Sequence, residues 1–349
     1  MKKLVIFALL VAMMLSMVAC ADLGSLLPNN NEPTNAPTNA PTNAPTNAPA
    51  EAPNDEPEAT VAPTTVVTEP PKSEAAVAVD DMIIAIGEVT TDSGDAITAA
   101  EEAYNALSDA EKAEVENLSV LTDARATYDK LAADAANKAA AADVVESIGK
   151  LSSDSKAETV LEVVHAYNAL SKEVQAYVDN YADLQEIAHT IGNKRLKNMT
   201  VEEDFVRGYN FYYPDALPWG GSYWYADQGC FALPYIGTSS NDVWMRLIFN
   251  YNAYDWIFFE EITVAADDQR FYDSFSYWDV VRDNSGGEVW EYMDIDVGNY
   301  ELEMLWAIAE SERTVVRFEG DDYYYDYTVT ANQKSSIKSA LITYELLCV

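Results

Sequence analysis

The sequence predicts a multidomain protein in which an all-α duplicated helical bundle precedes an α+β domain with a mainly antiparallel sheet. Three observations predict this arrangement. Residues 21–79 hold 11 of the 14 prolines, which excludes them from packed helices and sheets. Residues 80–199 lack proline, are rich in alanine and repeat internally, as expected of helices. Residues 200–349 hold all seven tryptophans and 17 of the 22 tyrosines, a composition typical of strands.

The first twenty residues have the features of an export signal. Two lysines precede an apolar run from Leu4 to Ala19 that only one serine interrupts. A membrane-spanning helix needs about 20 residues, so this shorter run fits the core of a cleaved signal peptide. The ending Leu-Ser-Met-Val-Ala-Cys resembles the lipobox of a bacterial lipoprotein. The resemblance implies removal of residues 1–19 and a diacylglycerol on Cys20, whose two acyl chains suffice for stable anchoring. The alternative is an ordinary signal peptide followed by a coincidental cysteine.

The segment that follows the lipobox predicts a spacer. Pro-Thr-Asn-Ala repeats four times between Pro33 and Ala48, and residues 21–79 contain no aromatic residue. Proline at every fourth position prevents regular backbone hydrogen bonding, so residues 20–79 are expected to form the lipidated cysteine and a disordered, solvated tether.

Charge excludes several classes of partner. The chain has a net charge of −37, and acidic residues exceed basic ones by 19 in residues 200–349. Such a surface repels phosphate, so we expect no nucleic-acid binding and no docking on anionic lipid through basic patches. The lipid on Cys20 is then the membrane contact. No calcium loop or comparable ligand spacing occurs, so we expect no metal and no cofactor.

An internal repeat divides residues 80–199. Ala-Tyr-Asn-Ala-Leu-Ser occurs at residues 103–108 and again at residues 166–171, an offset of 63 positions. Apolar residues around both copies recur at helical spacing. The sequence therefore predicts two helical-bundle repeats, at about 80–140 and 141–199, which an alanine-rich helix near residues 130–147 joins.

Capping boxes predict where helices begin in this segment. Ser108 with Glu111 is expected to open one helix, and Ser155 with Glu158 another. The segment resembles the helical-bundle repeats of Firmicutes surface proteins, and the resemblance implies a stalk or interaction spacer without activity. Histidine occurs only here, at positions 165 and 189, where it is expected to be structural or exposed.

Residues 200–349 predict strands with two added helices. The expected strands lie at 244–252, 256–265 and 270–278, with a turn at 283–287 and a hairpin of 314–318 with 323–330. Asn299 is expected to cap one helix, and Thr330 with Gln333 to open the last. The final 60 residues or so resemble the terminal domains of uncharacterised Firmicutes lipoproteins. The whole chain thus resembles an uncharacterised Firmicutes membrane-anchored lipoprotein, on the outer face of the cytoplasmic membrane.

Aromatic residues are the candidate binding residues of this domain. Trp219, Tyr223, Trp224 and Tyr225 lie in a stretch with proline and glycine, where a loop is expected to expose them to a glycan or protein. Residues 323–325 are three further tyrosines. The alternative is that these rings belong to the core. Cys230 and Cys348 are candidates for a disulfide, which an exported location permits, or for two buried thiols.

Catalysis has weaker support in the sequence. The domain contains no histidine, no nucleophile elbow and no phosphate loop. Paired carboxylates for glycoside hydrolysis are available among Glu260, Glu261, Glu288 and Glu291. We therefore expect a non-catalytic domain that binds an envelope protein or glycan. The alternatives are a cell-envelope glycan hydrolase that uses these carboxylates and a purely structural domain.

Overall fold

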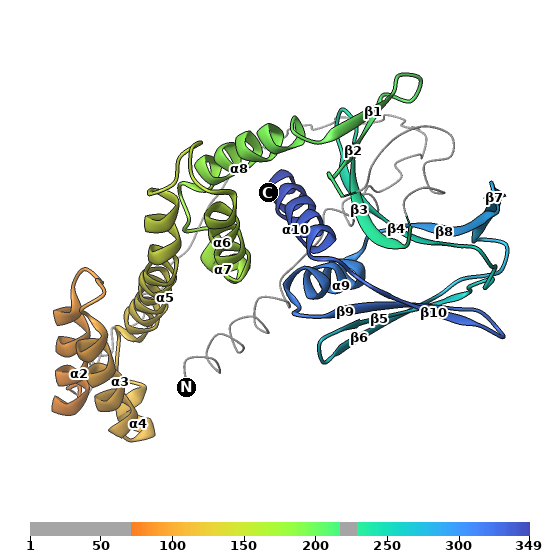
Figure 1. The fold of residues 1–349 in the computed structure, drawn as a ribbon. Coiled ribbons are helices and arrows are strands. Elements are labelled where there is room, and N and C mark those ends of the chain that lie inside the picture. Colours follow the sequence, from red (N-terminus) through yellow and green to blue (C-terminus); the bar gives the residue numbers. More distant parts are fainter. Residues whose placement is uncertain (1–70, 217–228) are drawn as a thin grey trace, which may run out of the picture. The chain divides into compact units, whose positions relative to one another are not determined.

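The computed structural model describes residues 71–216 and 229–349. They belong to two compact units, residues 71–135 in one and residues 136–349 in the other, and the division falls within one long helix. Helices give way to strands at residue 200, where the chain passes from helix α8 to strand β1 (Figure 1). The C-terminal part is an α+β domain whose described strand pairs are all antiparallel.

Helices fill the described chain up to residue 196. They are α2 (Glu74–Ile86), α3 (Gly94–Ala106), α4 (Asp109–Lys112), α5 (Leu118–Ile148), α6 (Ala157–Asn168), α7 (Lys172–Gln175) and α8 (Tyr181–Leu196). The long α5 confirms the predicted alanine-rich helix and extends it in the N-terminal direction.

The two predicted capping boxes of this segment have different outcomes. Ser108 accepts from the Glu111 N–H, and the Glu111 side chain accepts from the Ser108 N–H, as predicted. This box opens only the four-residue α4, however, and the next long helix begins at Leu118. The prediction of a capping box at Ser155 was wrong. Helix α6 has Lys156 at its N-cap, because the Ser155 hydroxyl instead accepts from the Ser152 N–H at 2.9 Å and closes the preceding turn.

The described residues contain ten strands in two sheets. The strands are β1 (Thr200–Asp204), β2 (Tyr209–Tyr213), β3 (Phe231–Thr238), β4 (Val243–Ala253), β5 (Glu261–Ala266), β6 (Gln269–Ser274), β7 (Val281–Ser285), β8 (Glu288–Asp296), β9 (Thr314–Glu319) and β10 (Tyr324–Thr328). One sheet has the order β1-β2-β3-β4-β8-β7 and the other β10-β9-β5-β6. The predicted hairpin is confirmed as β9 and β10, in which Glu319 pairs with Tyr324.

Two helices accompany the sheets: α9 (Asn299–Glu310) lies between β8 and β9 in sequence, and α10 (Ala331–Leu347) follows β10. The predicted capping box of Thr330 and Gln333 opens α10. Gly298, not Asn299, occupies the N-cap of α9, and its N–H donates to the Glu301 carboxylate at 2.7 Å. Figure 1 shows α10 beside α6, α8 and α9, and α10 also packs on β3 and β4. Its buried residues therefore contribute to two hydrophobic clusters, one with the sheets and one with the helices.

One predicted strand begins later than expected, and another ends earlier. The run 256–265 becomes strand only from Glu261, and residues 254–260 form a loop. The run 270–278 is strand β6 only to Ser274, and residues 275–280 form a second loop. The first difference has a physical cause, because the backbone N–H groups of residues 257–259 bind a buried carboxylate instead of a neighbouring strand.

Candidate functional site

Four aromatic rings gather on the two loops that the strand predictions missed. Trp256 and Phe258 come from the β4–β5 loop, and Tyr277 and Trp278 from the β6–β7 loop. The ring centroids of Trp256 and Phe258 lie 5.7 Å apart with an interplanar angle of 13°, and those of Phe258 and Tyr277 lie 6.3 Å apart at 30°. Trp278 meets Tyr277 edge-on at 5.2 Å. We call these four residues the aromatic platform.

Three of the four platform rings face water, whereas Trp256 is half-buried against the core of the domain. Phe258 is 44% exposed, Tyr277 40% and Trp278 87%. Phe258 also has a φ of 53°, in the left-handed region that a non-glycine residue adopts at a cost of about 1–3 kcal/mol. An exposed phenylalanine in a strained conformation contributes little to the stability of the core. The surrounding structure must therefore hold it in place.

Glu291 provides that support from strand β8. Its side chain is completely buried, and its Oε1 accepts the N–H groups of Ile257 at 2.9 Å and Phe258 at 2.8 Å. Its Oε2 accepts the Phe259 N–H at 2.9 Å and Nε of Arg282 at 3.1 Å. A carboxylate has about four lone-pair positions, so these four donors saturate it. Three successive N–H groups and one guanidinium thus fix the β4–β5 loop on the carboxylate.

Arg282 joins the same loop to the β6–β7 loop. Its Nη2 donates to the Phe259 carbonyl at 3.0 Å, and its Nη1 donates to the carbonyls of Tyr277 at 2.5 Å and Val280 at 3.2 Å. The guanidinium carbon lies 4.3 Å from the Tyr277 ring centroid and 5.8 Å from that of Phe258. The donors of Arg282 are therefore committed to the protein, and little capacity remains for an external anion.

The turn between β9 and β10 supports the platform from a third direction. A Cβ added to Gly320 would lie 2.0 Å from the Ile257 carbonyl oxygen and 2.8 Å from that of Phe258, so this close approach requires glycine. The Glu260 N–H donates to the Glu319 carbonyl at 3.0 Å, next to this contact. The platform is therefore held on three elements that are distant in the sequence.

The other sequence-predicted carboxylates do not form a cluster with Glu291. Glu260 lies at the end of the β4–β5 loop, and Glu261 begins β5, opposite Ser274 and Glu319 in register. Glu288 begins β8 and accepts from Nδ2 of Asn252 at 3.4 Å. Since the oxygens of Glu291 are buried and saturated, its position supports a structural use of this carboxylate.

The predicted aromatic candidates have mixed outcomes. Trp219, Tyr223, Trp224 and Tyr225 lie outside the described residues, as does Cys20. The tyrosines at 323–325 are described and are exposed by 66%, 60% and 43%, in that order.

The two cysteines of this domain are not bridged in the structure. Cys230 is buried, its Sγ donates to the Asn252 carbonyl at 3.6 Å, and burial raises the pKa of its thiol to about 11. Cys348 follows the last turn of α10 at the C-cap. The disulfide stays a prediction.

His165 binds the C-terminal helix. Its Nε2 lies 2.5 Å from Oε2 of Glu345 in α10, and Nε1 of Trp306 in α9 donates to the other oxygen of Glu345 at 2.5 Å. The imidazole thus joins α6 to α10, and this contact is structural.

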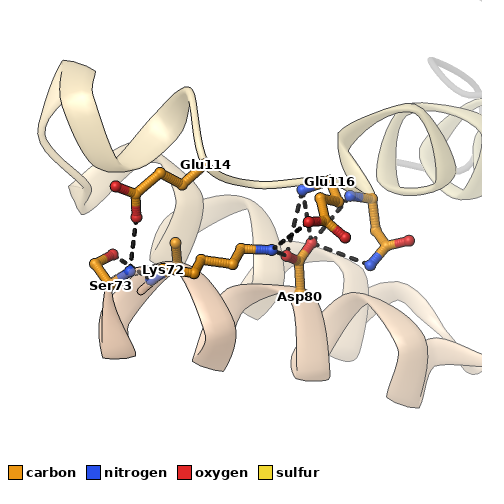
Figure 2. A network of polar contacts seen from close by, with 7 residues as sticks. Lys72, Ser73, Asp80, Glu114 and Glu116 are labelled. Carbon is orange, nitrogen blue, oxygen red and sulfur yellow. Dashed lines mark hydrogen bonds and ion pairs between the residues drawn. The ribbon is translucent and has the colours of Figure 1, made fainter. Parts of the chain in front are cut away.

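A separate polar network lies within residues 71–135. Figure 2 shows the buried Asp80 of α2 accepting from Lys72 and from the backbone N–H of Glu116. The backbone and side-chain nitrogens of Asn117 also donate to Asp80. Asp80 thereby fixes α2 to the chain that enters α5. The nearby groove between α3 and α5 has a volume of about 270 Å³, and an Arg125–Glu101 ion pair at 2.6 Å lines it.

Sequence reasoning assigned the platform residues to strands and missed them as a site. One signal was present, since Ser274, Ser276 and Asp279 are turn-forming residues that surround Tyr277 and Trp278. The support from Glu291 left no local signal, because it acts across more than 30 positions.

Comparisons with family models, with curated proteins and with solved structures give no match. No helix among the described residues is long and apolar enough to cross a membrane. The same residues contain no group of three or more histidine, cysteine or acidic side chains that could hold a metal ion.

Proposed function

We propose that this chain is a cell-surface lipoprotein, anchored through Cys20, whose C-terminal domain binds a partner through the aromatic platform without catalysing a reaction. The observation that carries the proposal is the pre-organised exposure of Phe258, Tyr277 and Trp278. Burial would stabilise the fold more than exposure of three neighbouring rings on two loops, one of which is strained at Phe258. Tryptophan and tyrosine on a rigid surface are the usual anchors of binding sites.

The helical segment is proposed to be a duplicated spacer. Helices α3 and α6 are each followed by a serine whose hydroxyl accepts an N–H three residues later, Ser108 from Glu111 and Ser171 from Val174, both at 3.4 Å. Each of these serines opens a four-residue helix, and the next helix begins ten residues after it, at Leu118 or Tyr181. The same capping serine, the same four-residue helix and the same spacing to the next helix thus recur at an offset of 63 residues. This agreement supports the proposal that the two segments arose by duplication of one helical unit.

Retention of envelope material tests the binding role. The full-length chain is inserted into liposomes through its lipid and incubated with solubilised envelope, and the retained proteins and glycans are compared with those of Trp278→Ala. The matched control is Phe205→Ala, which removes a 94% exposed ring from the β1–β2 loop. We expect Trp278→Ala to lose components that Phe205→Ala keeps. Equal retention by all three proteins contradicts the proposal.

The anchor has an independent test. Mass spectrometry of the native protein is expected to show a diacylglycerol on an N-terminal Cys20. A Cys20→Ala variant is expected to leave the membrane fraction. An unmodified thiol at this position contradicts the lipoprotein assignment.

A further inference from the structure

In the described part of the C-terminal domain, two arginine side chains are held by the same pair of groups, a tyrosine ring and a carboxylate. Arg282 lies over Tyr277 at 4.3 Å and binds Glu291 at 3.1 Å. Arg317 lies over Tyr324 at 4.2 Å and binds Asp326 at 2.7 Å. A guanidinium is planar and weakly hydrated, so it stacks on an aromatic face while its edge donates to an acid.

Arg282 already lies over Tyr277 and Phe258, but no lysine or arginine of the described residues is found over Trp278, the most exposed ring of the platform. The three segments that form or support it, residues 254–260, 275–280 and 320–323, contain Asp255, Glu260, Asp279, Asp321 and Asp322. They contain no lysine or arginine. Trp278 is 87% exposed and the adjacent Asp279 is exposed as well. Trp278 and Asp279 thus present an exposed ring and an exposed carboxylate at adjacent positions of one loop, the two kinds of group that hold Arg282 and Arg317.

Charge favours the same kind of partner. Residues 200–349 have 19 more acidic than basic residues, which attracts cations over several ångströms and repels anionic polymers. Arg282 offers an anion little, because it donates to Glu291 and to three backbone carbonyls.

From these observations we infer that the platform binds an arginine-bearing segment of a basic protein. The inference rests on the proposed binding role and specifies its partner. The rings are held in place before binding by Glu291, Arg282 and Gly320, so little ordering of the platform opposes association.

Peptide titration tests the inference. Tryptophan fluorescence of the full-length chain is followed during addition of hexa-arginine, hexa-lysine or the neutral sugar chitohexaose. We expect hexa-arginine to bind several-fold more tightly than hexa-lysine, because lysine lacks a planar group to stack. Trp278→Ala is expected to weaken hexa-arginine binding about fivefold, the usual size of a partly exposed cation–π contact. Phe205→Ala, with the same net charge, is expected to bind as wild type does.

Each other outcome has a defined meaning. Equal binding of both peptides that Trp278→Ala does not change shows general charge attraction and overturns the inference. Chitohexaose binding that depends on Trp278 also overturns it, while the proposed binding role stands. If Trp278→Ala changes the binding of none of the three probes, the envelope retention experiment shows which proposal has failed. Envelope components that are still retained only when Trp278 is present overturn the arginine inference and leave the binding role standing. Far-ultraviolet circular dichroism checks that Trp278→Ala is folded, as expected for so exposed a side chain.

Discussion

Replacing Glu291 by glutamine tests the network that holds the platform. The carboxylate is completely buried and accepts three backbone N–H groups and the Arg282 guanidinium. The amide oxygen of glutamine can still accept the N–H groups of Ile257 and Phe258. Its NH₂ group, however, would then face the Phe259 N–H and the Arg282 guanidinium, so that donors face donors. Breaking a buried ion pair costs about 3–5 kcal/mol. Since glutamine keeps part of the network, we expect Glu291→Gln to lower the free energy of unfolding by about 3 kcal/mol, a large share of the 5–15 kcal/mol typical of a domain.

Urea unfolding followed by tryptophan fluorescence measures this loss in the full-length chain. All seven tryptophans lie after residue 200, so the signal reports on the C-terminal domain. The matched control is Glu288→Gln on the same strand, where a half-exposed carboxylate makes one long hydrogen bond and a change within about 0.5 kcal/mol is expected. If Glu291→Gln unfolds within 1 kcal/mol of wild type, about the effect of an ordinary substitution, the network does not hold the loop and the reasoning is refuted.

Three further predictions concern other parts of the chain. Because the pKa of the Cys230 thiol is about 11, only about one thiol in a thousand is ionised at pH 8. Cys230 should therefore react with a disulfide reagent only after the protein is unfolded. If it does not react even in the unfolded protein, it is bridged to Cys348. Asp80→Asn should destabilise residues 71–135 by about 2 kcal/mol at pH 7, as seen by hydrogen exchange. Burial raises the pKa of Asp80, but the hydrogen bonds from Lys72 and three N–H donors together lower it by more. The pKa of Asp80 therefore lies below the ordinary carboxyl value. Its stabilisation should therefore be present above the ordinary carboxyl pKa and disappear as the pH falls through its own pKa; an unchanged Asp80→Asn effect in strong acid contradicts this. Gly320→Ala should lower the free energy of unfolding by about 1–3 kcal/mol, because the added Cβ would clash with the backbone of Ile257. The control is Gly149→Ala, whose Cβ would make only ordinary contacts. If both variants lose the same stability, the turn at Gly320 can shift and the prediction is wrong.

Local sequence patterns predicted the features that depend on neighbouring residues. The capping boxes at Ser108 and Thr330 and the β9–β10 hairpin are confirmed, because each depends on groups within a few positions. The box at Ser155 failed although its pattern was the same. A competing turn with Ser152 used the same hydroxyl, and a motif cannot show which of two local bonds prevails.

The environment of the second copy of the sequence repeat required the tertiary structure. At the 63-residue offset, Glu101 and Arg125 correspond to Val164 and Ala188. The first pair forms an ion pair that lines a surface groove, whereas the second pair is buried in a cluster that includes Ile342 and Leu346 of α10. The sequence contains this difference, but it does not show that the C-terminal helix covers the second repeat.

The sequence by itself indicated helices before residue 200 and strands with two helices after it, and it contains the acidic charge and the concentration of aromatic residues in the second part. Only the tertiary structure decided which rings face water, because that depends on a carboxylate in β8 binding the backbone of a loop more than 30 residues earlier. Periodicity describes one segment at a time, whereas the position of Phe258 depends on three segments that meet only in the folded chain.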